Sequence, residues 1–249
     1  MAHAAFPLTH PRPQVVGSIG SSADLAALVP SAVRSACDLV EIRLDLLSTP
    51  AASPPPWRHL LESPLIFTAR RADEGGGGSA LSAAERMALL EPLLAQAAWL
   101  DIEVASIGEM RPLLAELATR GIPWLASFHD FAALPATAVL EEAARRARDA
   151  GAGAFKAAAR LHQVEDLARL AQFQLADHGL PVATMGMGPL AAVSRLLCAQ
   201  CGSVLNYGYL GHTATAPGQW DAALLTHAIA GLVPHGGLGA WGLGLGARG

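Results

Sequence analysis

One lysine interrupts an otherwise apolar, strand-like stretch of the chain, Gly153 to Ala159 (GAFKAAA). Burying an ammonium group is costly unless the group is paired or uncharged. A lysine kept neutral by burial is the kind of amine nucleophile that forms Schiff bases with carbonyl compounds. Alternatively, Lys156 extends from a strand end so that its ammonium reaches water. The stretch alone favours this second interpretation, so the other polar residues of the chain must decide.

Polar residues recur at every second position in neighbouring strand-like segments, which places them on one face of each strand. The sets are Glu41, Arg43 and Asp45; Thr68 and Arg70; Asp101 and Glu103; Ser127 and His129; and Lys156 itself. In a closed barrel the apolar face of each strand packs against helices, so these polar residues would line the lumen near the carboxyl ends of the strands. Individually they also have structural interpretations, as buried ion pairs or strand caps. Together they favour an active site, because unsatisfied buried charges are so costly.

The elements that would position these residues alternate along the whole chain. Strands are predicted at 14–18, 38–44, 64–69, 99–104, 122–128, 154–158, 181–185 and 203–207. Each is followed by a helical pattern, at 22–36, 57–61, 82–97, 107–119, 136–150, 164–177, 189–200 and 219–232. Repeated strand–helix units with no G-x-G-x-x-G or Walker A sequence predict an α/β fold, a (β/α)8 TIM barrel in a single domain, over an open doubly wound sheet.

Length and composition set the remaining bounds. The 249 residues suit one barrel domain, and we expect a flexible N-terminal arm at 1–13, the catalytic barrel at 14–233 and a Gly-rich tail at 234–249. A net charge of −4 does not indicate the positively charged surface that nucleic-acid binding requires. No apolar run is long enough to span a membrane, and residues 1–13 do not resemble a secretory signal. We therefore expect a soluble, cytoplasmic protein.

Cysteine usage agrees with a reducing compartment. Three cysteines argue against a disulfide scaffold. Cys198 and Cys201 form a C-x-x-C, but this pair closes an apolar helical run, whereas a redox motif opens a helix. We interpret it as a chance occurrence.

At this point the residues match a known family. The chain resembles type I 3-dehydroquinate dehydratase, the Schiff-base-forming enzyme of the shikimate pathway, from about residue 15 to residue 231. The resemblance is carried by VEIRLDLL at 40–47, FTARRADEGG at 67–76, LDIEV at 100–104, ASFHDF at 126–131, FKAA at 155–158, TMGMGPLAAVSR at 184–195 and TAPGQ at 215–219. Each motif alone is weak, but their common order and spacing make the resemblance specific.

The resemblance implies a catalytic trio of Lys156, His129 and Glu74. Lys156 would attack the ketone of 3-dehydroquinate, His129 would move the protons of the elimination to 3-dehydroshikimate, and Glu74 would orient His129. It also implies a homodimer, with neither a metal nor an organic cofactor. The residues that it places around the substrate are Ser18, Glu41, Arg43, Arg70, Met185, Met187, Arg195, Tyr207, Thr215 and Gln219.

Several of these assignments depend on the resemblance. By itself Arg195 would be interpreted as a solvated surface charge, whereas in the family the matching arginine clamps the substrate carboxylate. Thr215, which replaces the usual serine, and Gln219 would lie in a loop that closes over the ligand. Tyr207 stands where the family usually has phenylalanine, and its additional oxygen needs a partner if it is buried.

Two other functions stay open. A different Schiff-base barrel, such as a class I aldolase acting on a phosphorylated sugar, would need a phosphate site after the seventh and eighth strands, which the MGMG at 185–188 could provide. A catalytically silent homologue could bind quinate-like ligands as a sensor. The presence of Lys156, His129 and Glu74 argues against the silent homologue.

Overall fold

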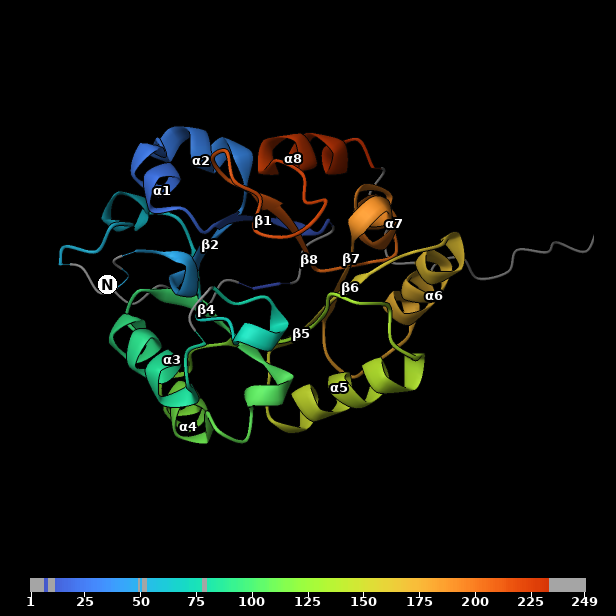
Figure 1. The fold of residues 1–249 in the computed structure, drawn as a ribbon, viewed down its shortest axis with the longest axis horizontal. Helices are drawn as coiled ribbons and strands as arrows, with labels where there is room; N and C mark the ends of the chain where they lie inside the picture. The colour runs from blue at the N-terminus through green and yellow to red at the C-terminus, as the bar shows by residue number, and fades with distance from the viewer. Residues whose placement is uncertain (1–6, 9–11, 49, 51–52, 78–79, 233–249) are drawn as a thin grey trace, which may run out of the picture.

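Eight parallel strands form the centre of the protein, and helices surround them (Figure 1). The computed structural model describes residues 7–8, 12–48, 50, 53–77 and 80–232. The strands are β1 (Gln14–Ile19), β2 (Leu39–Arg43), β3 (Leu65–Thr68), β4 (Ala97–Glu103), β5 (Trp124–Asp130), β6 (Ala154–Arg160), β7 (Val182–Met187) and β8 (Leu205–Tyr209). All of the predicted strands are present. The fold is the expected (β/α)8 TIM barrel in a single domain.

The barrel is nearly closed. Hydrogen-bonded neighbours run in the order β7-β6-β5-β4-β3-β2-β1-β8, and no ladder between β7 and β8 occurs among the described residues. One bond joins these two edges at the start of β8, where Val204 N donates to Val182 O over 3.0 Å. Higher up, the Arg195 side chain spans the same seam by donating to carbonyls of Gly186 and Tyr207.

The helices differ from the sequence prediction at their ends and in one loop. They are α1 (Ser22–Ala27), α2 (Pro30–Ala36), α3 (Ala83–Leu90), α4 (Arg111–Arg120), α5 (Thr137–Asp149), α6 (Val164–Leu175), α7 (Ala191–Gln200) and α8 (Ala222–Ala230). The prediction of one helix over 22–36 was wrong. Pro30 lacks the amide hydrogen that would continue α1 and instead starts α2.

The segment between β2 and β3 also differs from the prediction. The helix expected at 57–61 is a single 3-10 turn, Arg58–Leu60, so the described part of this connection holds no α-helix. A PPP run at 54–56 removes three amide donors just before it. Helix α8 begins at Ala222, three residues later than predicted, because the Asp221 side chain caps the amides of Ala223 and Leu224.

The two faces of the strands carry separate cores. Outward-facing residues such as Val40, Ile42 and Phe155 pack against the helices. Residues at the lower end of the lumen, among them Val16 and Leu39, form a second apolar cluster, and Leu8 packs with it. This inner cluster provides an apolar floor beneath the polar end of the barrel. The domain boundaries at 14 and 233 stay predictions, and the tail at 234–249 lies outside the described residues.

Close contact between β8 and α8 depends on Gly208. A Cβ atom at this position would lie 2.6 Å from Ala222 Cα and 2.9 Å from Ala222 N. We expect Gly208→Ala to lower the free energy of unfolding by about 1–3 kcal/mol, because backbone must move to admit the methyl group. Gly108→Ala is the matched control, since a Cβ there meets nothing within 4 Å. Equal urea midpoints for the two variants would contradict the prediction.

Candidate active site

A cavity opens at the carboxyl ends of the strands, above the apolar floor. Its empty volume is about 500 Å³, including the space at its open mouth. Every residue that the resemblance placed at the site lines this cavity except Ser18, which lies behind Glu41. The lining residues are Glu41, Arg43, Arg70, Glu74, Gly75, His129, Phe131, Lys156, Ala158, Met185, Met187, Arg195, Tyr207, Thr215, Ala216 and Gln219.

Lys156 projects from β6 into the cavity with 3% of its surface exposed. The interpretation that its ammonium reaches bulk water is therefore wrong. Instead Lys156 Nζ lies 2.6 Å from Asp101 Oδ2, and the same nitrogen stands 4.4 Å from the centre of the Tyr207 ring. The lysine is thus stabilised by pairing, the first of the two ways in which a buried amine can be accommodated.

Asp101 was predicted to face the lumen but was not assigned to the site. It pairs directly with Lys156, a contact that the sequence analysis did not predict. Its Oδ1 accepts from Arg70 Nη1 over 2.9 Å and from Ser127 Oγ over 2.6 Å. Burial alone would raise the pKa of Asp101, but Arg70 and Lys156 outweigh burial and hold its pKa below the usual range. The carboxylate is therefore ionised.

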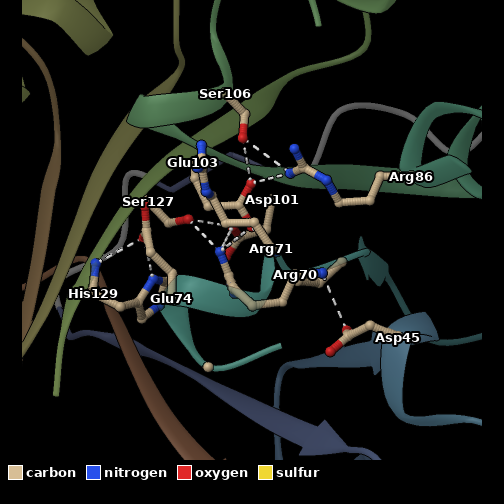
Figure 2. Close-up of polar contacts among 12 residues, drawn as sticks. Asp45, Arg70, Arg71, Glu74, Arg86, Asp101, Glu103, Ser106, Ser127 and His129 are labelled. Carbon is tan, nitrogen blue, oxygen red and sulfur yellow. Dashed lines mark hydrogen bonds and ion pairs between the residues drawn. The ribbon is translucent and has the colours of Figure 1, made fainter. Parts of the chain in front are cut away.

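A buried network continues from Asp101 toward helix α3 (Figure 2). Arg70 also donates to Glu103 Oε1 over 3.1 Å. The other oxygen of Glu103 accepts from Arg86 Nη1 over 2.7 Å and from Ser106 Oγ over 3.0 Å. Asp101 and Glu103 thus serve both interpretations given to them, since they form buried ion pairs and also hold Arg70 at the cavity wall.

Glu74 and His129 form a second pair of side chains at the cavity, also visible in Figure 2. Glu74 Oε2 accepts from the backbone amide of His129 over 2.9 Å and lies 3.0 Å from its Nδ1. Burial, followed by Arg70 and Lys156, lowers the pKa of His129 well below its ordinary value. A neutral imidazole that donates from Nδ1 to Glu74 leaves Nε2 as an acceptor for a proton from the cavity.

Hydroxyl groups hold Glu41 on β2. Ser18 Oγ donates to Glu41 Oε2, and Thr68 Oγ1 donates to Glu41 Oε1 over 2.8 Å. Thr215 Oγ1 lies 2.9 Å from Ser18 Oγ and 2.9 Å from Gln219 Oε1. These bonds connect the 215–219 loop to β1 and through it to Glu41. Ser18 therefore supports the site from behind.

Arg43 is fixed at the mouth of the cavity. Its guanidinium bonds both oxygens of Asp45, at 3.0 and 2.8 Å, and the carbonyl of Gly75 at 2.9 Å. Strand β2 ends at Arg43, so Asp45 lies in a 3-10 turn, Leu44–Leu46. Arg43 and Asp45 still lie on the same side of the chain, as expected, although Asp45 is outside the strand.

Arg195 is buried, with 1% of its surface exposed, which contradicts the default interpretation of a surface charge. Its Nε donates to Tyr207 O over 3.1 Å, and its Nη1 donates to Gly186 O and Ala191 O, each over 3.0 Å. No carboxylate pairs with Arg195 among the described residues. Burial lowers its pKa to about 10, so the group stays cationic at neutral pH. A buried cation at a cavity wall, held by carbonyls alone, suits an anionic ligand.

The apolar side of the cavity consists of Met185, Met187 and the Tyr207 ring. No group of three or more His, Cys, Asp or Glu side chains that could hold a metal occurs in the part of the chain that the structure describes. Across those same residues, none of the helices is long and apolar enough to cross a membrane.

Burial raises the pKa of Glu74 from 4.5 to about 7, which links its ionisation to stability. The folded state binds this proton more tightly than the unfolded chain, so Glu74 lowers stability progressively as the pH rises from about 4.5 to 7. We expect Glu74→Gln to match the original protein at about pH 4 and to be more stable than it at about pH 8 in urea unfolding.

Glu85→Gln is the control for this experiment, because hydrogen bonds from Ser82 lower the pKa of Glu85. Its effect must have the opposite sign, with the variant less stable than the original protein at the higher pH. A Glu74→Gln variant whose stability difference does not change with pH would show that Glu74 is not perturbed.

The comparisons with known proteins agree with this geometry. Residues 18–232 match the sequence profile of the family described as Type I 3-dehydroquinase. The 3-dehydroquinate dehydratase of Methanothrix thermoacetophila is 32% identical over 219 residues, which cover 87% of this chain and 91% of that protein. The enzyme of the same name from Desulfotalea psychrophila is 32% identical over 207 residues, 81% of this chain and 90% of that protein.

A solved structure shares the fold. The 3-dehydroquinate dehydratase of Geobacillus kaustophilus superposes with a TM-score of 0.76 at 24% identity, covering 88% of this chain and 90% of that one. Both the profile and the relatives extend over most of the barrel. The chain therefore belongs to the type I 3-dehydroquinase family, whose enzymes are carbon–oxygen lyases.

Proposed function

We propose that this protein dehydrates 3-dehydroquinate to 3-dehydroshikimate through an imine on Lys156, with His129 as the general acid and base. The observation that carries this proposal is the place of the lysine. Of the 17 lysine and arginine residues in the sequence, all but Lys156 are arginine. The single lysine is buried in the cavity beside His129, and the dehydratases that resemble this chain carry the same activity in their names.

The first step is attack of Lys156 Nζ on the substrate ketone. Lys156 gives up one proton so that its lone pair can attack, and the carbinolamine oxygen gains protons so that it can leave as water. Overall, an ammonium and a ketone give an iminium and one water, so the positive charge at the nitrogen is the same before and after. Asp101, 2.6 Å from Nζ, can therefore stabilise the lysine and the iminium alike. The iminium withdraws electrons from the adjacent carbon and acidifies its C–H bond.

The second step is elimination of water. His129 Nε2 takes the proton from the carbon beside the iminium, which leaves an enamine and an imidazolium. The enamine electrons then expel the hydroxyl on the next carbon, and the imidazolium protonates it as it leaves as water. Glu74 stabilises the transient charge on His129 through Nδ1, 3.0 Å away. Hydrolysis of the product iminium returns the ketone and the free lysine.

The rest of the cavity suits a polyhydroxylated carboxylic acid. Arg195, a cation with no carboxylate partner in the described residues, would receive the substrate carboxylate. Glu41, Arg43 and Arg70 present charged hydrogen-bonding groups to ring hydroxyls. The Thr215 and Gln219 loop, which lines the cavity, would close over the ring.

Borohydride reduction in the presence of 3-dehydroquinate tests the imine. We expect a substrate-dependent mass increase that peptide mapping places on Lys156, because reduction makes the carbon–nitrogen bond permanent. The assignment is unusually clear, since the α-amino group of the chain is the one other aliphatic amine in this sequence. Lys156→Ala should show neither the adduct nor measurable turnover.

Three results would contradict the mechanism: no adduct on Lys156, an adduct that forms with sugar phosphates only, or turnover by Lys156→Ala near the original rate. The second would favour a class I aldolase. Binding without turnover or adduct would favour the silent homologue.

His129→Ala tests the acid-base role. Removing the imidazole should lower kcat by about 10²–10⁴-fold, since general acid-base catalysis typically contributes that much. Imine formation should survive, so borohydride should trap Lys156 at least as completely as in the original protein. An unchanged kcat would contradict the assigned role. The cytoplasmic location and the homodimer stay predictions.

A further inference from the structure

Tyr207 carries a buried hydroxyl that nothing in the described structure uses. The residue is 4% exposed, and its Oη has no hydrogen-bond partner. Burying a hydroxyl without a partner costs free energy that a phenylalanine of nearly the same volume would not incur. Such a group in a native protein calls for an explanation, and a ligand that accepts its hydrogen bond supplies one.

The surroundings place the Tyr207 ring at the reacting end of the cavity. The Tyr207 ring lies against Lys156 Nζ, 4.4 Å from the ring centre, and the residue lines the cavity. Its backbone carbonyl accepts from Arg195 Nε over 3.1 Å. The Tyr207 side chain therefore lies against the amine proposed to bind the ketone, and the Tyr207 backbone bonds the arginine proposed to bind the carboxylate.

The nearby carboxylates are already occupied. Glu41 accepts from Ser18 and Thr68, while Asp101 accepts from Arg70, Ser127 and Lys156. Burial, together with these two carboxylates, raises the pKa of Tyr207 well above its ordinary value. The phenol therefore keeps its proton and is available as a hydrogen-bond donor.

We propose that Tyr207 Oη donates a hydrogen bond to a ring hydroxyl of the bound substrate, which makes Tyr207 a specificity-determining residue. This inference rests on the proposed function, because it takes a polyhydroxylated ring joined to Lys156 as the ligand. The bond gives the buried phenol its missing partner. It also discriminates against rings that lack the accepting hydroxyl, since a site built to bond a hydroxyl rejects analogues without it.

Tyr207→Phe separates a ligand-binding role from a structural one. We expect the variant to be as stable as the original protein or more stable, because an unpartnered polar group is removed. Its kcat/KM for 3-dehydroquinate should fall about tenfold. Tyr209→Phe, on the same strand but outside the cavity lining, is the matched control and should change kcat/KM less than about twofold.

Analogues of 3-dehydroquinate that each lack one ring hydroxyl identify the acceptor. The analogue without that hydroxyl should bind equally well to the original protein and to Tyr207→Phe in competition assays. Each of the other analogues should bind more tightly to the original protein than to Tyr207→Phe. Any of three results would overturn the inference. Tyr207→Phe could leave kcat/KM unchanged, or it could lose activity in step with a loss of stability. Alternatively, the difference in binding between the two proteins could persist for every analogue.

Borohydride trapping distinguishes a failure of the inference about Tyr207 from a failure of the proposed function. If Lys156 is trapped in both proteins but kcat/KM is equal, the inference about Tyr207 fails alone. If Lys156 is not trapped in the original protein, the proposed function fails with it.

Discussion

The ion pair between Lys156 and Asp101 is the interaction on which the upper half of the barrel depends. Both charges are out of contact with bulk water, and a buried pair is tolerated only when further hydrogen bonds satisfy each member. Asp101 meets this requirement with Ser127 and Arg70, and Arg70 in turn requires Glu103. The charges alternate in sign from the lumen through β4 to Arg86 on α3, so replacing any one of them leaves its neighbours uncompensated.

This network explains why residues remote from the cavity matter to it. Arg86 reaches Glu103 because α3 begins at a defined residue, where the Ser82 and Glu85 side chains form a capping box. The second pair, Glu74 and His129, makes none of these bonds. The positive charges of Arg70 and Lys156 nevertheless lower the pKa of His129, which helps to keep the imidazole neutral. The lumen thus combines a strongly charged side with a neutral base on the neighbouring strand.

Much of the fold follows from local patterns. Alternation of polar and apolar residues identified the inward face of the second to the sixth strand, because that pattern depends only on the two-residue repeat of a strand. What local spacing could not supply was register. The register places Lys156 opposite Ser127 on β5, and Ser127 opposite Glu103 on β4. Asp101 lies two residues before Glu103 on the same face of β4, where Lys156 Nζ reaches it. The burial of Arg195 was equally hidden, since it depends on the seam between β7 and β8, which no local pattern reveals.

The Arg195 side chain has two roles. It bridges the β7 and β8 edges, which lack a ladder among the described residues, and it faces the cavity as a cation. In consequence, a change at this one side chain would alter both the attraction of the cavity for an anion and the bonds that cross the joint between β7 and β8. Redesigning the protein for an uncharged ligand would therefore require new bonds across this joint as well as a new residue at the cavity wall.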